Sequence, residues 1–351
     1  MKSNTGLALL GLAASTIGAP VSNTTAKFDI SSEDASIAGL SDTNILAFAL
    51  VLEHLETAFY NEAIKKYSAS DFADGVYEEV LRLGKDESTH VDTLTTVLKS
   101  LGAYAPEACK YSFPYKSAEQ FIALASIIEG VGVSAYSGAA VSVKNLAILG
   151  AAASILSVEA RHDAILRLNS GVVPYPNPFD TPLDFNQVWS LASPFIVPGS
   201  CQLDSSFLKL TAFPALAVTS TTGGNGITNP TKVGATIILK ADIEVTSSVA
   251  PRHIGRSHEH LHHKKDAAAS GDVYAAFLTS TGAIIAETEQ QDGTFTVEVP
   301  EGLAGQTYVI LVSDKNGIHD STTLAGPAVL EVESPLGPTV VYEKSGSGQK
   351  C

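Results

Sequence analysis

Residues 155–167 read ILSVEARHDAILR and place Glu159 and His162 three positions apart. Side chains with this spacing lie one turn apart on the same face of a helix. The same arrangement occurs in LRLGKDESTHVDTL, residues 81–94, which contains Glu87 and His90. The chain therefore has two Glu-x-x-His motifs, each within a stretch of helical periodicity.

Two further glutamates complete a repeating order. Glu53 lies in LVLEHLETAFY, residues 50–60, and Glu129 lies in SIIEGVG, residues 126–132. A single Glu followed by Glu-x-x-His, repeated once over four helical segments, is the layout of di-metal carboxylate sites in helix bundles. Tyr60 and Tyr136 each follow the single Glu by seven residues. The repeat predicts two helical hairpins related by a pseudo-twofold axis, with the metals between them.

Glu-x-x-His alone is weakly specific, because a third copy, Glu259-x-x-His262, lies in a histidine-rich insert. The context of the other two copies distinguishes them. Both lie in the middle of a helix on its apolar stripe, where an unpaired carboxylate would be costly to bury. Carboxylates and imidazoles are ligands for iron and manganese, so this placement favours a metal site.

The spacing of apolar residues predicts four helices within residues 41–171. Their boundaries are set by a cap at Ser41/Asp42, an end near Tyr67, a start after Ser70, an end at Gly102, a Ser117-x-x-Gln120 capping box, a break at residues 143–145 and an end at Gly171. The connection 103–116 can span about 45 Å when extended, and a 27-residue helix is about 40 Å long. It can therefore return along the whole bundle.

The chain has 351 residues, 45% of them hydrophobic and 17% charged, which is ordinary for a globular protein of about two domains. Its formal charge of -15 argues against nucleic acid as a partner, since phosphate binding needs a basic surface. Beyond the N-terminus we expect no membrane span. The fourth helix comes closest, and its charged residues argue against it.

Residues 1–19 contain Lys2, a short apolar core and a small-residue site, which together predict a secretory signal peptide. The alternative is a poorly ordered apolar tail. Residues 20–40 would form an N-terminal arm, in which Asn23 begins a glycosylation sequon. The sequence therefore predicts a secreted protein, extracellular or in a cell wall.

Three cysteines fit an oxidising compartment. We expect Cys109 to pair with Cys201. Cys351 is left over in a flexible tail, residues 344–351, where it would bridge to another chain or be blocked by a small thiol. Residues 172–205 are rich in proline and aromatic residues, and we expect a strap packed on the bundle.

From residue 206 to 343 the periodicity changes to short β-branched runs separated by Gly, Asn, Asp and Pro. About seven such runs predict an antiparallel β-sandwich, immunoglobulin-like in outline. The expected fold class is α + β, a four-helix bundle followed by this sandwich. An insert at residues 252–265 would be a solvated loop or a loose site for zinc or copper, through His253, His258, His260, His262 and His263.

The two Glu-x-x-His motifs and the single glutamates make residues 41–170 resemble the ferritin-like superfamily. With its secretory N-terminus and appended β region, the chain resembles the secreted fungal stress-response and late-sexual-development proteins, which are related to plant desiccation-related proteins. The resemblance implies a ferritin-like bundle holding two Fe or Mn ions. The implied ligands are Glu53, Glu87, His90, Glu129, Glu159 and His162.

Within this set the resemblance implies that Glu87 and Glu159 bridge the two ions. It also places Tyr60 and Tyr136 just outside the ligands, with ordinary core tyrosines as the alternative. Glu56 lies one turn after Glu53, as either an additional ligand or a surface or salt-bridged glutamate.

Three functions remain open. The first is redox chemistry on oxygen or peroxide, of an oxidase, ferroxidase or peroxidase/catalase-like kind, which would suit stress protection. The second is an extracellular matrix or cell-wall protein that uses the bundle as a metal-free scaffold and associates through the β domain or Cys351. The third is metal sequestration without turnover.

Overall fold

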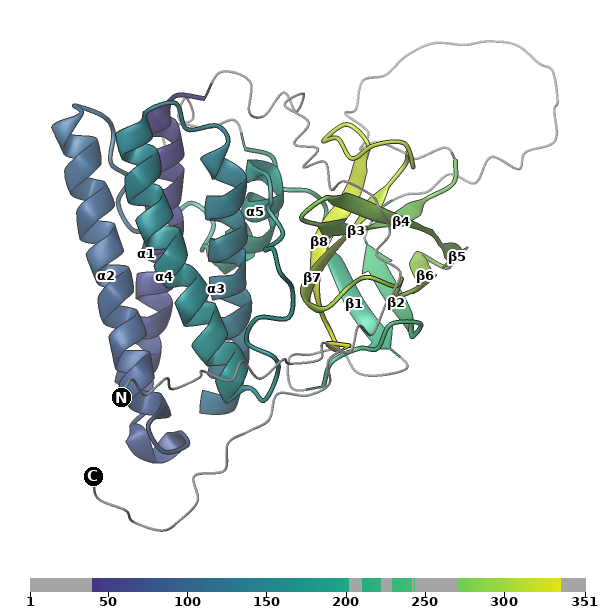
Figure 1. The fold of residues 1–351 in the computed structure, drawn as a ribbon, viewed down its shortest axis with the longest axis horizontal. Helices are drawn as coiled ribbons and strands as arrows, with labels where there is room; N and C mark the ends of the chain where they lie inside the picture. The colour runs from purple at the N-terminus through teal and green to yellow at the C-terminus, as the bar shows by residue number, and fades with distance from the viewer. Residues whose placement is uncertain (1–39, 202–209, 222–228, 242, 244–270, 336–351) are drawn as a thin grey trace, which may run out of the picture.

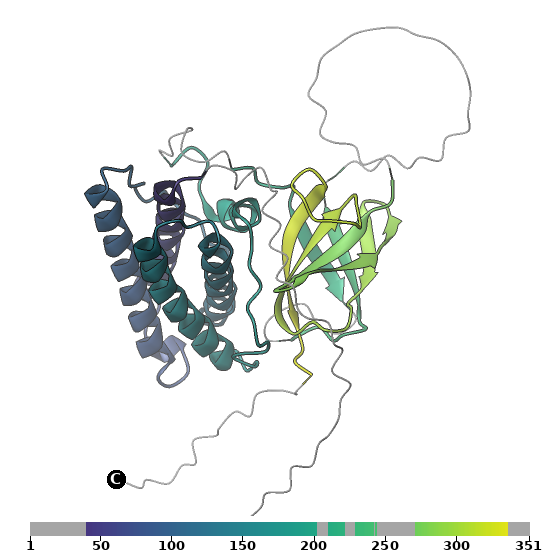
Figure 2. The same cartoon turned by 45° about the horizontal axis from the view of Figure 1, so that its top comes forward.

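The computed structural model describes residues 40–201, 210–221, 229–241, 243 and 271–335. A bundle of long helices lies beside two β-sheets (Figures 1 and 2). The predicted signal peptide, the arm with Asn23, the histidine-rich insert and the tail with Cys351 fall outside the described residues. Those predictions therefore stay predictions.

The four predicted helices are present. They are α1 (Asp42–Lys66), α2 (Val76–Ser100), α3 (Ala118–Ala140) and α4 (Leu146–Asn169). Their contacts pair α1 with α2 and α3 with α4, as two hairpins require. The connection after α2 has no helix and returns the chain to the start of α3.

One helix boundary differs from the prediction, and one predicted capping box forms only in part. The second helix begins at Val76 and not after Ser70, because a short 3-10 turn, η1 (Ala69–Asp71), comes first and Gly75, at φ +84°, is the N-cap residue of α2. Ser117 caps α3 by accepting from the backbone N–H of Gln120. The Gln120 side chain, however, accepts from Lys116 and not from Ser117, so the predicted capping box forms only in part.

Among the residues that the structure describes, one helix, α3, is long and apolar enough to cross a membrane, with a mean hydropathy of 1.4 over its most apolar window. This corrects the expectation that the fourth helix comes closest. Within the molecule 67% of that window is buried, as expected for a helix that contacts neighbours on most of its sides. The small residues of α3 allow neighbouring segments to approach its backbone closely. A Cβ on Gly138, for example, would lie 1.9 Å from the Leu183 carbonyl oxygen.

The strap contains a helix that the sequence reading missed. Helix α5 (Phe185–Ala192) and the 3-10 turn η2 (Ser193–Phe195) lie within it. Asp184 caps α5 in a capping box with Gln187, and Phe185 and Val188 are buried. The predicted Cys109–Cys201 disulfide is present and ties the strap to the crossover connection.

Eight described strands form two antiparallel four-stranded sheets with the orders β1-β2-β6-β5 and β4-β3-β7-β8. Their bounds are β1 (Leu216–Thr221), β2 (Thr236–Ala241), β3 (Tyr274–Thr279), β4 (Gly282–Glu287), β5 (Glu289–Gln291), β6 (Thr294–Glu298), β7 (Gly305–Val312) and β8 (Thr323–Val332). Lettered in chain order, these are the A-B-E-D and C′-C-F-G sheets of an immunoglobulin-like sandwich. Residues 283–290 form one of the short runs in the sequence, but the structure divides this run between β4 and the short β5.

The sandwich and the bundle share one hydrophobic core. Ala276, Tyr308 and Ile310 of the β4-β3-β7-β8 sheet belong to the same buried cluster as Phe121 and Leu166 of the bundle. Polar contacts cross the same boundary. The Tyr308 hydroxyl donates to the Gly130 carbonyl at 3.0 Å, and Arg167 donates to Glu331 through two nitrogens. The two parts therefore pack against each other over both apolar and polar surface.

Candidate metal centre

The six expected ligands meet at the centre of the bundle. Glu53 comes from α1, Glu87 and His90 from α2, Glu129 from α3, and Glu159 and His162 from α4, and all six are buried. Each lies on the inward stripe of its helix, which is why a spacing of three brings each Glu and His pair to the same point.

The ligand atoms form two overlapping groups, and within each group they lie within 4.8 Å of one another. The groups are Glu53, Glu87, His90, Glu159 and Glu87, Glu129, Glu159, His162. Glu87 and Glu159 belong to both. The geometry therefore places the two expected bridging carboxylates between one Glu and His on one side and one Glu and His on the other.

Distances within the groups suit metal ligation. His90 Nδ1 lies 3.2 Å from an oxygen of each of Glu53, Glu87 and Glu159. His162 Nδ1 lies 2.8 Å from Glu87 Oε1 and 3.3 Å from Glu129 Oε2. With metal–ligand bonds of about 2.1 Å, adjacent ligand atoms of an octahedral ion are about 3.0 Å apart.

Several of these atoms have no hydrogen bond in the described structure. They are Glu87 Oε1, Glu129 Oε2, both carboxylate oxygens of Glu159, and His162 Nδ1. Buried carboxylate oxygens without a partner are costly. Because the orphaned atoms all face one another, a cation between them would satisfy them together. The residues present therefore fit a pair of metal ions.

The pKa values of the clustered side chains also favour bound cations. Burial, with the negative charge of Glu87 adding to it, raises the pKa of Glu53 to about 8. Burial opposes the ionisation of Glu87, but the imidazoles of His162 and His90 outweigh it and lower the pKa to about 2. Burial likewise opposes protonation of His90 and His162, but nearby carboxylates raise their pKa values to about 12 and about 11. Without metal, the centre therefore retains protons that cations would replace.

The two tyrosines hold the outer carboxylates in a reciprocal pattern. The Tyr60 hydroxyl donates to Glu129, and the Tyr136 hydroxyl donates to Glu53 Oε1 at 2.5 Å. Burial raises the pKa of both phenols, so both remain donors. Each hairpin therefore supplies the tyrosine that orients the glutamate of the other, as a pseudo-twofold arrangement requires.

Glu56 is not a surface glutamate, since its side chain is only 4% exposed. A Cβ on Gly132 would lie 3.0 Å from both Glu56 Oε1 and Glu159 Oε2, so this glycine gives the two carboxylates room to approach each other. Burial, followed by the negative charge of Glu159, raises the pKa of Glu56 well above its usual value. Glu56 also lines an apolar cavity of about 230 Å³ that is walled by residues of α1, α3, α5, η2 and β8.

The sequence reading missed Asp86. His162 Nε2 donates to Asp86 Oδ2 at 3.3 Å, and this leaves the Nδ1 lone pair facing the ligand groups. The only signal in the sequence is an acidic residue directly before Glu87 in KDESTH. Nothing in a helical pattern predicts that it reaches a histidine 76 positions away.

Replacing Asp86 by Asn is expected to weaken one of the two metal positions by about tenfold, the lower end of the effect of such orienting partners, because Asp86 is half-exposed. Titration of the metal-free protein with Mn²⁺ would show one weakened and one unchanged equivalent. Asp92→Asn, an exposed change on the same helix, is the matched control. Equal weakening of both equivalents would contradict the assignment.

Comparison with known proteins agrees with this geometry. The sequence model of the family described as "Ferritin-like domain" matches residues 41–171. The chain is similar to Protein rds1 of Schizosaccharomyces pombe, with 29% identity over 193 residues, which are 54% of this chain and 47% of the relative. The chain thus spans about half the length of that relative. These matches bear out the predicted resemblance to the ferritin-like superfamily and to a fungal group of relatives.

Among solved structures, the chain is similar to a conserved hypothetical protein, rv2844, from Mycobacterium tuberculosis. The identity is 22% and the TM-score is 0.33. The match covers 36% of this chain and 95% of that chain.

Proposed function

Because residues 41–171 form a ferritin-like domain, we propose that this is a secreted di-metal carboxylate protein that acts on dioxygen or peroxide. One observation carries the proposal. Two buried ligand groups share Glu87 and Glu159 and contain orphaned oxygens that face one another. Glu53 and His90 would hold one iron or manganese ion, and Glu129 and His162 the other.

The residues of the centre suit this task. Four carboxylates balance the charge of two divalent ions, and the imidazoles bind through neutral nitrogen. Tyr60 and Tyr136 fix the outer carboxylates, and the surrounding core excludes water. Two bound ions would supply electrons in pairs to an oxygen species that reaches them.

The apolar cavity beside Glu56 supports a small, uncharged oxidant as the substrate. Dioxygen and hydrogen peroxide can enter an apolar cavity far more readily than an ion can. Glu56 lies between the cavity and Glu159, and burial raises the pKa of its carboxyl group well above the usual value. Glu56 would therefore hold a proton at its carboxyl oxygen where the oxidant arrives.

The Cys109–Cys201 disulfide supports secretion, since such bonds persist in oxidising compartments. Together with the predicted signal peptide, it favours an extracellular or cell-wall location. Oxidant removal there would protect the cell during stress.

Metal analysis of protein purified from its native secretion tests the proposal. We expect about two equivalents of iron or manganese per chain, as in other bundles with this ligand order. Glu87→Ala/Glu159→Ala should lose both, because both ions share these ligands. Glu78→Ala/Glu119→Ala, which removes two exposed helix glutamates, should lose neither.

Consumption of oxygen or peroxide by the loaded protein then separates the remaining functions. Turnover that disappears with Glu87→Ala/Glu159→Ala supports redox chemistry. Bound metal without turnover would indicate sequestration. Absence of metal from both the unmodified protein and the variant would leave the metal-free scaffold and would end the proposal.

A further inference from the structure

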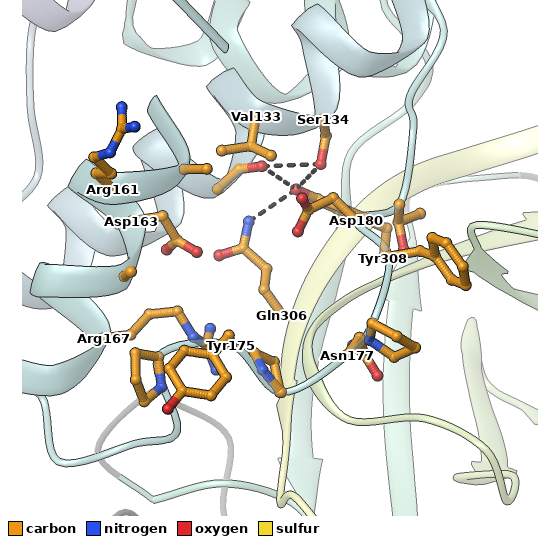
Figure 3. A pocket seen from close by; sticks show the side chains of 18 residues that line it. Val133, Ser134, Arg161, Asp163, Arg167, Tyr175, Asn177, Asp180, Gln306 and Tyr308 are labelled. Atoms are coloured by element: carbon orange, nitrogen blue, oxygen red, sulfur yellow. Dashed lines mark hydrogen bonds between the residues drawn. The ribbon is translucent and has the colours of Figure 1, made fainter. Parts of the chain in front are cut away.

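A second cavity, of about 330 Å³, lies where the bundle, the strap and the sandwich meet. It is bounded by α3 and α4, by residues 174–181 of the strap and by β7, and none of the six metal-centre ligands lines it. Figure 3 shows Asp163, Gln306 and Arg167 around its interior and Tyr175 and Asn177 along the strap. Its volume is within the range of small-molecule sites.

Three polar side chains that line this cavity donate hydrogen bonds to the protein. The Tyr308 hydroxyl donates to Gly130, Gln306 Nε2 donates to Ile127 at 3.2 Å, and Asn177 Nδ2 donates to Ala304 at 2.6 Å. These bonds hold the lining in place.

The arginines are engaged as well. Arg167 donates through Nε to the Val173 carbonyl, and through Nη1 and Nη2 to Glu331 at 3.0 and 2.6 Å. Arg161 donates along its own helix to Ser157, and in Figure 3 its guanidinium points away from Asp163 and Gln306. Arg167 is thus the cation that faces the interior, and its charge is already paired.

Hydrogen-bond acceptors in the cavity lining, in contrast, remain available to a ligand. Asp163 accepts one bond, from Ser126 at 3.3 Å, through one of its two oxygens. Among the hydrogen bonds of the described residues, none reaches the Asp180 carboxylate or Gln306 Oε1. Arg167 is paired with Glu331, which lies outside the cavity lining, and no ion pair of the described residues reaches Asp163 or Asp180. The cavity therefore offers these two carboxyl groups as acceptors to whatever enters it.

We propose that this cavity binds a small primary ammonium compound, with its charged group between Asp163 and Asp180 and its apolar body against Tyr175. An ammonium group brings three N–H donors and one positive charge, which is what the lining lacks. The Tyr175 side chain is 80% exposed beside the cavity, and its ring gives the apolar body of the ligand a surface to pack on.

Other ligand classes fit less well. An anion would be repelled by Asp163 and Asp180, and Arg167 is already paired with Glu331. A neutral sugar would bring no counter-charge for the carboxyl groups of Asp163 and Asp180. A calcium ion takes about six to eight oxygen ligands, more than the open acceptors of Asp163, Asp180 and Gln306 supply.

Calorimetric titration of the full chain with benzylamine, at neutral pH and low salt, tests the proposal. We expect a dissociation constant near or below about 1 mM. Benzyl alcohol has nearly the same shape but no charge, and it should bind at least about tenfold more weakly, because it loses a charge-assisted hydrogen bond. Added salt should weaken the binding of benzylamine.

Variants locate the site. Asp163→Asn, at the inner carboxylate, should weaken benzylamine binding by about tenfold or more. Asp180→Asn, at the exposed carboxylate, should weaken it by about two- to fivefold, and Tyr175→Leu by about as much. Asp92→Asn removes the same charge from α2, at the side of the bundle away from the sandwich, and should change nothing (Figure 1).

Asp180 and Tyr175 lie on the exposed strap, so their variants test the site without disturbing the bundle. Equal affinity for benzyl alcohol and benzylamine would overturn the proposal. So would benzylamine binding that none of the three cavity variants changes. Calcium chloride or cellobiose binding at this cavity in place of benzylamine would assign it to a cation or a sugar and would also overturn it.

Discussion

Arg167→Met is expected to destabilise the protein by about 3–5 kcal/mol, because it leaves Glu331 buried without its counter-charge. Arg167 is 1% exposed and Glu331 is 6% exposed. The guanidinium donates to both oxygens of the carboxylate, and it links α4 of the bundle to β8 of the sandwich. Urea unfolding monitored by circular dichroism would measure the loss.

Two controls separate an uncompensated charge from a lost contact. Arg167→Met/Glu331→Leu removes both charges and should recover most of the stability. Arg82→Met breaks the exposed pair with Glu79, 69% and 34% exposed, and should cost less than about 1 kcal/mol. An Arg167→Met loss no larger than that of Arg82→Met would contradict the prediction.

The metal-free protein is expected to lose stability as the pH rises from about 5 to 9. The folded-state pKa of Glu53, raised to about 8, lies above its usual 4.5. The pKa values of His90 and His162 are raised to about 12 and about 11, above the usual 6.5. At any pH between the usual pKa of one of these groups and its raised pKa, the folded state binds more protons than the unfolded state. Each excess proton lowers stability by about 1.4 kcal/mol per pH unit.

Glu87 does not offset this loss. Its pKa is lowered to about 2 from 4.5, so its ionised carboxylate stabilises the folded state fully above pH 4.5. This stabilisation is lost only as the pH falls from 4.5 towards 2. Bound metal replaces the protons of the other groups, so the metal-loaded protein should show a much smaller decline over the same range.

Thermal unfolding at pH 5, 7 and 9, with a chelator and with added Mn²⁺, would measure both behaviours. Glu53→Gln should reduce the decline of the metal-free protein below pH 8, because the amide carries no proton to lose. A metal-free protein that becomes more stable from pH 5 to 9 would show that the cluster does not retain these protons.

Most of the features that were predicted correctly follow from the spacing of residues within single helices and strands. A spacing of three between Glu87 and His90, and between Glu159 and His162, puts each pair on one helix face whatever surrounds it. The apolar stripe around them then predicts that this face is inward. Strand runs and turn residues likewise predicted the sandwich, and its strand order agrees with the immunoglobulin-like outline.

The sequence pattern gave a wrong prediction where contacts with other segments determine the secondary structure or the buried face. Helix α5 has only eight residues and lies in a proline-rich stretch, which resembles a loop. Helical spacing would continue the apolar stripe of α2 from Leu94 to Val97 and Leu101. The buried side chain there is Leu98, and Val97 and Leu101 are less buried, because the packing partners select the face.

The sequence by itself determined that four acids and two imidazoles face the interior of a bundle, because helical periodicity is a property of the chain alone. Only the tertiary structure decided that Glu56 is buried against Glu159, that each tyrosine serves the opposite hairpin, and that Arg167 meets Glu331. These pairs come from different helices and strands, and Arg167 and Glu331 are 164 residues apart in the chain. Their meeting depends on how whole elements pack, which no local spacing records.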